Sequence, residues 1–531
     1  MSLPARMLLA EDNGMNMEIA EFLSENAGIS GIKGYNGKEA PSCLNSLLIK
    51  NDRSDSAAVK NKKRQEFDRM KENLTTGPIL KTLTRLAIPI MASSFLGTLY
   101  NITDMAWIGQ LGSKAVAGVG VGGMFTWLSQ GLASMARMGG QVQTAQCIGR
   151  GDREKAHCYA QAALQLSILM GLLFAAVCLI FTKPLVGFFQ LQDKEALDAA
   201  LSYTRIACGL IVFSFLSLTL TGLYTAQGDS KTPFFANLIG LAANMILDPV
   251  LILGMGPFPK LGAAGAAIAT VTAQAIVMSI MLLGILRKNR ENVLKGSRLF
   301  AKIPKEQLVG ICRIGIPTAI QGMAYCAISM VLTRMVSAFG AEAVATQRVG
   351  GQIESISWNT ADGFSSALNA FVAQNYGAGK MERVKKGYRA SLWTVGAWGL
   401  LINLAFVLAP GAIAGVFFYE PKAIKTAVDY LVIVGFSEAF LCVELTTVGA
   451  LSGLGRTKLC SIISIIFTSA RIPFAVFLSK TALGLSGIWW ALSITSMIKG
   501  VVFVFTFFRV TGRKNPQNCG RETCTQKKDV L

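Results

Sequence analysis

Long apolar segments dominate this 531-residue chain and limit what it can fold into. About twelve stretches of mostly apolar residues follow one another, each long enough to cross the roughly 30 Å hydrocarbon core of a bilayer as a helix. They lie near residues 82–108, 115–143, 156–182, 200–226, 233–254, 263–286, 309–338, 343–373, 387–416, 426–452, 457–478 and 484–509. With 52% hydrophobic and 15% charged residues, the chain is too apolar for an ordinary soluble protein. We therefore predict an all-α polytopic membrane protein with about twelve transmembrane helices.

Lysine and arginine gather in alternate loops, and this pattern predicts the orientation of the chain. The loops after the second, sixth and eighth predicted spans are rich in them, whereas those after the first, fifth and eleventh are nearly free of them. The positive-inside rule then places both the N and C termini in the cytoplasm, as an even number of spans requires. Because the net charge of +20 follows from topology, we expect no nucleic-acid partner.

The residue inventory offers little material for catalysis. His157 is the only histidine, and the eleven cysteines show no close-spaced framework. No glycine-rich phosphate loop ending in Gly-Lys-Ser/Thr is present, which disfavours an ATP-driven pump. The sequence therefore predicts neither an enzyme nor a bound cofactor.

The first seventy-odd residues are polar and differ from the rest of the chain. Ala5–Asn13, Asn16–Leu23 and Tyr35–Ala40 resemble the first strand, first helix and second turn of a response-regulator receiver domain. The resemblance stops there, since Asp52 and Asp55 lie in a charged, Ser-rich stretch rather than at the end of an apolar strand. We expect residues 1–75 to be a cytoplasmic segment that is disordered or a vestigial, truncated receiver.

The remainder of the chain contains an internal duplication. Gly112–Ala117 recurs as Gly340–Ala345 at an offset of 228 residues, and Gly228–Lys231 recurs as Gly455–Lys458 at an offset of 227. Two repeats of six spans each enter the membrane in the same orientation. We predict an N-terminal six-helix bundle over 76–300, a C-terminal six-helix bundle over 301–510 and a basic cytoplasmic tail over 511–531. A substrate path between the two bundles is typical of transporters.

Three motifs stand out between residues 76 and 510: Thr103-Asp104 with Gly109–Gly112, then Asn244–Pro249, then Ala373–Gly379. Together they resemble the multidrug and toxic compound extrusion (MATE) family over essentially that whole range. The resemblance implies an antiporter that exports cationic, amphipathic drugs in exchange for H⁺ or Na⁺. It also implies a multi-pass protein of the cell (inner) membrane.

Two acidic residues lie inside predicted spans of the first repeat, where an uncompensated charge costs about 2.5–3.5 kcal/mol on insertion scales. Asp104 follows Tyr100 by four residues and Asp248 follows Asn244 by four, so each pair shares a helix face. With Thr270 at a similar depth, we expect these five residues to converge near the outer side of the first bundle. The resemblance to the MATE family implies the same five positions as its ion site.

The duplication provides an internal control for these acids. In the second repeat Asp104 corresponds to Leu332, Tyr100 to Ile328 and Asp248 to Ala475. The repeat therefore keeps the scaffold without the carboxylates, which favours a functional over a structural role for Asp104 and Asp248.

We expect the ion and the drug to compete for the same carboxylates. An apolar cavity favours the protonated form of an acid, and Na⁺ is the alternative ion, with ligands at Asp104, Asp248, Asn244 and Thr270. Either ion removes the negative charge that a cationic drug needs. Competition combined with alternating access produces exchange.

The second repeat offers secondary candidates in Glu354, Glu438 and Glu444. Glu438 and Glu444 are six residues apart and so lie on different helix faces. The seventh predicted span contains no acid. We expect a monomer surrounded by membrane lipid, with small cationic drugs as its transported partners.

Two other functions fit parts of the sequence. A flippase for lipid-linked or polysaccharide precursors would have a similar design, but it favours a cationic cavity, and the charged residues inside the spans are mainly acidic. A membrane-bound signalling protein would use the receiver-like segment, which lacks the strand that carries the phosphorylated aspartate.

Overall fold

The computed structural model describes residues 74–512 except 190, 192, 256–258, 288–291, 296–303 and 418–420. These residues belong to one compact unit, Met70–Leu531. Within them the regular secondary structure is helical, with no strand. The receiver-like segment, most of the basic tail and the predicted bundle boundary at residue 300 lie outside the described residues.

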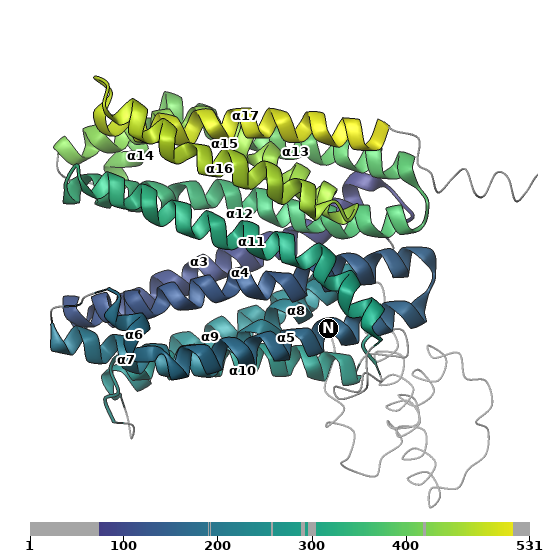
Figure 1. Ribbon diagram of the computed structural model, residues 1–531, viewed down its shortest axis with the longest axis horizontal. Coiled ribbons are helices and arrows are strands. Elements are labelled where there is room, and N and C mark those ends of the chain that lie inside the picture. Colours follow the sequence, from purple (N-terminus) through teal and green to yellow (C-terminus); the bar gives the residue numbers. More distant parts are fainter. Residues whose placement is uncertain are drawn as a thin grey trace, which may run out of the picture. The chain divides into compact units, whose positions relative to one another are not determined.

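The helices form two groups, which Figure 1 shows one above the other. The first group, named the N-lobe here, comprises α3 (Ile79–Gly109), α4 (Ser113–Arg150), α5 (Arg153–Ile180), α6 (Thr182–Gly187), α7 (Lys194–Gly209), α8 (Val212–Ala226), α9 (Lys231–Leu253) and α10 (Ala263–Arg287). The second, the C-lobe, comprises α11 (Lys305–Ser337), α12 (Ala341–Gly377), α13 (Met381–Leu408), α14 (Pro410–Phe417), α15 (Pro421–Gly453), α16 (Thr457–Ser479) and α17 (Gly484–Gly512). The lobes meet chiefly where α11 packs on α4 and where α12 packs on α3 and α4.

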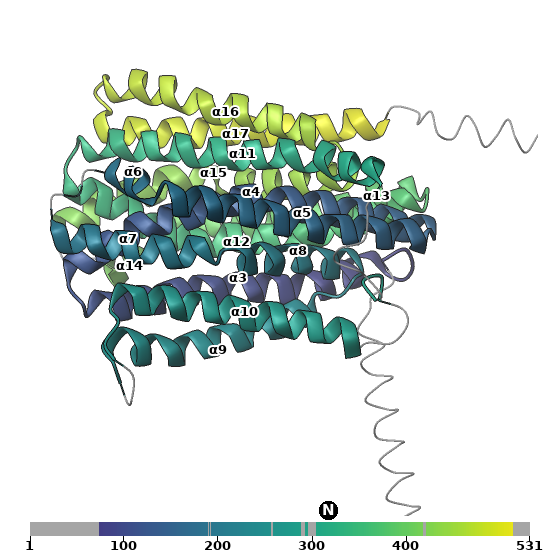
Figure 2. The ribbon, with the colours of Figure 1, turned by 60° about the horizontal axis from the view of Figure 1, so that its bottom comes forward.

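Most of the described helices are suited to a membrane. Nine are long and apolar enough to cross one, and α7 with α8, bent by 47° at their junction, would make a tenth span. The predicted spans 115–143 and 343–373 correspond to the long helices α4 and α12. Neither belongs to the nine helices that are apolar enough to cross a membrane. Figure 2 shows both between outer helices such as α9 and α16, where contact with other helices replaces contact with lipid and permits polar side chains. The count of twelve spans and the cytoplasmic termini stay predictions.

The duplicated sequence produces duplicated turns. Gly112 and Gly340 precede α4 and α12 with φ of 99° and 108°, a region that favours glycine. Gly151 and Gly379, at φ of 79° and 74°, lie just beyond the ends of the same two helices. The repeated glycines therefore mark where the central helix of each lobe begins and ends.

Equivalent residues of the two repeats meet where α4 and α12 cross. Gln141 donates a hydrogen bond from Nε2 to Oδ1 of Asn369, its counterpart 228 residues later, at 3.0 Å. Two residues related by a two-fold operation can contact each other only close to its axis. The pair therefore marks the pseudo-two-fold axis between the lobes.

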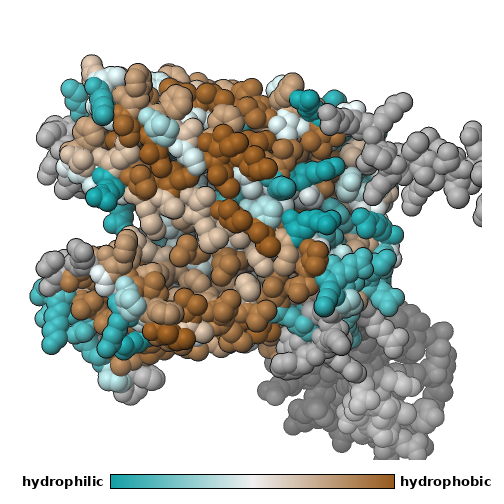
Figure 3. All heavy atoms as spheres, in the orientation of Figure 1, coloured by the Kyte–Doolittle hydropathy of each residue, from teal (hydrophilic) through white to brown (hydrophobic). Residues whose placement is uncertain are grey.

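The lobes are in tight contact at the end where α4 and α12 finish. A Cβ added at Gly149 would lie 2.0 Å from the Gln374 carbonyl oxygen, and one at Gly377 would lie 2.1 Å from that of Gln146. At the opposite end, where these helices begin, Figure 3 shows a hollow between the lobes. Apolar residues cover the middle of the surface and hydrophilic ones gather toward its two ends. The described lobes are thus closed at one end and open at the other.

Candidate functional site

Two carboxylates lie deep in the N-lobe on neighbouring helices. Asp104, on α3, is 9% exposed, and Asp248, on α9, is completely buried. Asn244 donates from Nδ2 to Oδ1 of Asp248 at 3.0 Å, because four residues of helix place the two on one face. Since α3 packs along α9, the acids come close enough to interact electrostatically.

The other two predicted residues join this cluster. Tyr100, one turn before Asp104, interacts with both carboxylates, and its hydroxyl approaches Thr270 of α10. The structure therefore brings together all five residues that the sequence predicted to converge. Their role in ion coupling stays a prediction.

Unpaired oxygen atoms distinguish this cluster from an ordinary polar core. One buried oxygen of each of the five residues has no hydrogen-bond partner within the described structure: Tyr100 Oη, Asp104 Oδ1, Asn244 Oδ1, Asp248 Oδ2 and Thr270 Oγ1. Buried polar atoms are normally satisfied, so a group of unpaired oxygens is suited to bind a proton or a cation. Among the residues described, no three acidic, histidine or cysteine side chains form a metal site. A Na⁺ ion would therefore need the neutral oxygens of Asn244 and Thr270 beside the two carboxylates.

Tyr203 of α7 also belongs to the cluster, although the sequence analysis missed it. It is 6% exposed, interacts with both carboxylates and approaches Thr270. A Cβ on Gly122 would lie 2.5 Å from its ring, and in the C-lobe one on Gly350 would lie 2.1 Å from Tyr430. The tyrosine therefore recurs 227 residues later against the equivalent glycine. Only this recurrence could have identified Tyr203 from the sequence. A single tyrosine in a membrane span is too common to indicate a functional site.

In the C-lobe the equivalent place is apolar. Ile328, Leu332 and Ala475, the counterparts of Tyr100, Asp104 and Asp248, are all buried in one hydrophobic cluster. The same helix packing therefore forms without carboxylates at these positions. The N-lobe acids are not required by the fold.

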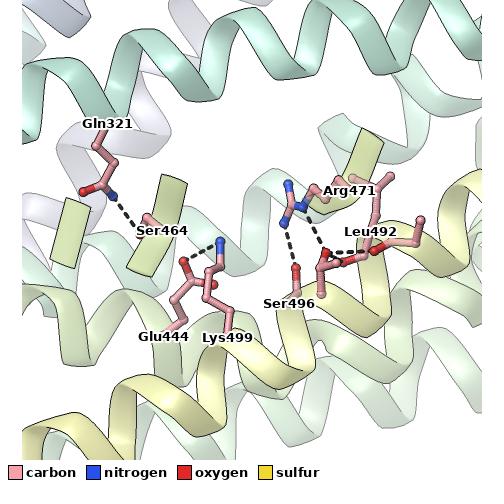
Figure 4. A network of polar contacts seen from close by, with 9 residues as sticks. Gln321, Glu444, Ser464, Arg471, Leu492, Ser496 and Lys499 are labelled. Atoms are coloured by element: carbon pink, nitrogen blue, oxygen red, sulfur yellow. Dashed lines mark hydrogen bonds and ion pairs between the residues drawn. The ribbon is translucent and has the colours of Figure 1, made fainter. Parts of the chain in front are cut away.

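The three secondary candidates have two different environments. Glu444 forms an ion pair with Lys499 of α17 at 2.9 Å, with both side chains buried (Figure 4). Glu354 of α12 accepts a hydrogen bond from the Tyr430 hydroxyl and interacts with Glu438 of α15. As their spacing predicted, Glu438 and Glu444 face different partners.

Two buried bases of the C-lobe were missed from the sequence. Arg471, on α16, donates from Nε to Thr495 Oγ1 at 3.2 Å and from Nη2 to Ser496 Oγ at 2.8 Å (Figure 4). Lys499 is the partner of Glu444. A basic residue inside a membrane span is as rare and as costly as an acidic one. Arg471 and Lys499 could therefore have been identified from the sequence by the same criterion as Asp104 and Asp248. Acids still predominate: the buried charged residues that the structure describes are Asp104, Asp229, Asp248, Glu438, Glu444, Arg471 and Lys499.

The arrangement of two pseudo-symmetric lobes, with polar clusters buried among membrane-spanning helices, defines a membrane transporter. The MatE family model matches residues 89–250 and 317–477, one match in each repeat. The chain belongs to the MatE family, whose members are multi-pass membrane transporters and not enzymes. The bacterial relatives are consistent with a place in the inner membrane.

Known proteins similar to this chain are named as multidrug resistance, multidrug export or transporter proteins. A probable multidrug resistance protein NorM from Thermotoga maritima is 29% identical over 434 residues, which cover 80% of this chain and 90% of that protein. The multidrug export protein MepA of Staphylococcus haemolyticus is 22% identical, with 82% and 94% covered. A FAD transporter of Shewanella oneidensis is 24% identical, with 83% and 97% covered.

Solved structures share the fold. A MOP superfamily transporter from Pyrococcus furiosus has a TM-score of 0.76 and 23% identity, covering 83% of this chain and 97% of that one. A multidrug resistance MATE family transporter in an outward-facing conformation has the same TM-score and identity. At this level of identity the likeness establishes the fold alone.

Proposed function

We propose that this protein is a secondary active antiporter that exports cationic, amphipathic compounds in exchange for H⁺ or Na⁺. The cluster of unpaired oxygens around Asp104 and Asp248 is the observation that supports this function most directly. The names of the NorM and MepA relatives agree with export of drugs.

The cluster explains how one site could exchange two cations. When Asp104 and Asp248 are ionised, two adjacent negative charges in a medium of low dielectric attract a cation strongly. A proton or Na⁺ removes that charge, so the ion and the drug bind in competition. A transporter that changes its open side only when one of them is bound then couples their movements.

The composition of the interior supports a cationic substrate over a lipid-linked anion. Of the buried charged residues in the described structure, five are acids and two are bases. Lys499 is neutralised by Glu444, and Arg471 lies within electrostatic reach of Glu354. The buried bases therefore do not form the cationic cavity that a precursor flippase would need.

Efflux of a fluorescent cationic dye from proteoliposomes tests this function. A pH gradient and a Na⁺ gradient are imposed separately on wild type, Asp104→Asn and Asp198→Asn, an exposed control on α7. We expect one gradient to drive efflux in wild type and the control but not in Asp104→Asn. Absence of gradient-driven dye transport in wild type would reject the proposal, and FAD is the next substrate to assay because of the Shewanella relative.

A further inference from the structure

Two duplicated glutamines join the lobes at their closed end. Gln146 of α4 donates a hydrogen bond from Nε2 to the Gly453 carbonyl oxygen of α15 at 3.0 Å. Gln374 of α12 donates from Nε2 to the Ala226 carbonyl oxygen of α8 at 2.7 Å. Each bond therefore starts in one lobe and ends in the other. No member of the N-lobe cluster takes part in either bond.

The internal duplication makes the two bonds equivalent. Gln374 follows Gln146 by 228 residues, and Gly453 follows Ala226 by 227. The donor of each repeat therefore binds the acceptor position of the other repeat, as a two-fold relation between the lobes requires. Because the acceptors are backbone carbonyls, alanine and glycine serve equally well at that position. Both repeats have kept the glutamine, whose side chain the bond does require.

The two acceptors are helix-end carbonyls that lack a backbone partner. α8 ends at Ala226 and α15 at Gly453, and each helix is followed by a turn around a glycine, Gly228 with φ of 80° and Gly455 with φ of 76°. In both turns, two backbone N–H groups bind carbonyls of the preceding residues, but within the described structure none binds the carbonyl of Ala226 or Gly453. The glutamine of the opposite lobe supplies the missing donor. The duplicated turn of each lobe therefore presents one acceptor to the other lobe.

Both glutamines are buried among small residues. Gln146 is 6% exposed and Gln374 is 4% exposed. The residue before each glutamine and one of the two acceptors form a cluster without exposed surface, consisting of Ala145, Ala373 and Ala226. The backbone carbonyls of the two glutamines leave no room for a Cβ at Gly377 and Gly149. The small side chains therefore let the lobes approach until each amide reaches its carbonyl.

A neutral amide suits a contact that breaks when the lobes separate. Water then binds both the amide and the carbonyl, so the net gain from one such bond is small. While the lobes are in contact, both bonds are buried, and removing the donor would leave a buried carbonyl without a partner. Each bond therefore favours the closed arrangement by a modest amount without preventing its opening.

We propose that Gln146 and Gln374 form a two-part latch that sets how often the transporter opens at this end. Both bonds break in the same movement, because each of them spans the interface between the lobes. The two glutamines are positioning residues, since they act on the equilibrium between two arrangements of the lobes. The inference rests on the alternating access of the proposed function, but not on which ion or compound is exchanged.

Gln227 provides a matched control. It is 7% exposed, directly follows the acceptor Ala226 and donates from Nε2 to the Leu223 carbonyl oxygen at 3.1 Å. Donor and acceptor belong to the same lobe, so this bond persists when the lobes separate. A substitution of Gln227 therefore removes a buried glutamine bond near the same end of the lobe without removing a contact between the lobes.

Distances between spin labels across the closed end test the latch. Glu154 and Glu382 are exposed, equivalent residues in the first turns of α5 and α13, and cysteines there label one lobe each in a chain whose native cysteines are replaced. Methionine keeps the length of glutamine but has no N–H donor. Gln146→Met and Gln374→Met should each raise the ratio of the long to the short distance about tenfold. The double variant should raise it about 100-fold, because the two bonds share no partner, and Gln227→Met should leave it unchanged.

A second pair of variants tests the reach of the side chain. Gln146→Asn and Gln374→Asn keep the amide but end one methylene short of the carbonyl, so each should shift the ratio in the same direction. An unchanged ratio in the methionine and asparagine variants would overturn the latch, and so would an equal shift in Gln227→Met. The distance measurement needs no transport. Failure of the latch is therefore distinguishable from failure of the proposed antiport, which dye efflux from proteoliposomes tests.

Discussion

At the scale of single residues, the duplicated chain shows which polar groups the fold does not need. Leu332 and Ala475 occupy, in the C-lobe, the places that Asp104 and Asp248 occupy in the N-lobe, and both are buried in a hydrophobic cluster. A membrane protein tolerates buried acids at a cost in stability, so acids present in only one repeat point to function. The same comparison applies to Arg471, which replaces Asn244.

Exchanging the N-lobe acids for their C-lobe counterparts is the sharpest test of this view. We expect Asp104→Leu/Asp248→Ala to insert and fold with an unfolding temperature no lower than that of wild type, because the equivalent C-lobe packing already accommodates these side chains. Ion-coupled efflux should fall to background. Dye efflux measures the activity, and thermal unfolding in detergent measures the unfolding temperature. Full activity in the variant would refute the assigned site.

The ion pair between Glu444 and Lys499 has a structural effect that can be separated from transport. Its side chains are 7% and 5% exposed, so removing one partner leaves an uncompensated buried charge. Lys499→Met should destabilise the protein by about 3–5 kcal/mol, and adding Glu444→Leu should restore most of that loss. The free energy of unfolding is measured for Lys499→Met, for Glu444→Leu and for the double variant. If the losses of the two single variants add up in the double variant, the two side chains are not coupled.

At the scale of helices, α4 and α12 differ from the others because they pack against protein along much of their length. Their close approach depends on glycine at Gly149 and Gly377, where even a methyl group would overlap the partner backbone. Gly120, on the same α4, has open space where a Cβ would lie. One helix therefore contains both an intolerant and a tolerant glycine.

Alanine at these two positions should have opposite outcomes. Gly149→Ala forces α4 away from α12 at the closed end, which should destabilise the protein by about 1–3 kcal/mol and impair transport. Gly120→Ala should leave transport unchanged and should not lower the stability, because alanine is the better helix former. Thermal unfolding and dye efflux compare the two variants, and equal behaviour would show that the closed end tolerates separation.

At the scale of the whole transporter, the described lobes are open at one end and closed at the other. Exchange by alternating access requires the lobes to open and close at opposite ends in turn. Contacts between lobes must then break and form during each cycle. One of them is the hydrogen bond from Asn359 Nδ2 of α12 to Thr98 Oγ1 of α3, at 3.2 Å.

Joining the lobes at this contact should stop transport. We expect Thr98→Cys/Asn359→Cys, treated with a short bifunctional thiol reagent that a reductant cleaves, to lose dye efflux and to regain it on reduction. Each single-cysteine variant serves as a control for the reagent. Undiminished efflux after complete cross-linking would mean that α3 and α12 do not separate at this point.

The receiver-like segment is tested at the same scale. Removal of residues 1–69 should leave the efflux rate and its ion dependence unchanged, because the polar clusters of both lobes lie in Met70–Leu531. Proteoliposome efflux of the shortened chain provides the measurement. Loss of transport despite normal insertion would favour the signalling alternative.

The positions of the helices and the identity of the N-lobe cluster could be predicted from sequence because they depend on local patterns. Apolar runs predict membrane helices wherever water is absent, since only internal hydrogen bonding satisfies the backbone there. Asp104 and Asp248 stood out because a charge within such a run is rare, and the four-residue spacing identified Tyr100 and Asn244. The duplication supplied the comparison with the second repeat.

The sequence by itself therefore determined the membrane class, the two-repeat design and five of the six residues of the N-lobe cluster. Only the tertiary structure decided that Tyr203 joins that cluster, that Glu444 is neutralised by Lys499, and that Glu438 lies beside Glu354 without a hydrogen bond. These relationships join different helices, and the sequence spacing between helices does not determine which faces meet. Which helix faces pack together decides whether a buried ionisable side chain has a partner of opposite charge or none.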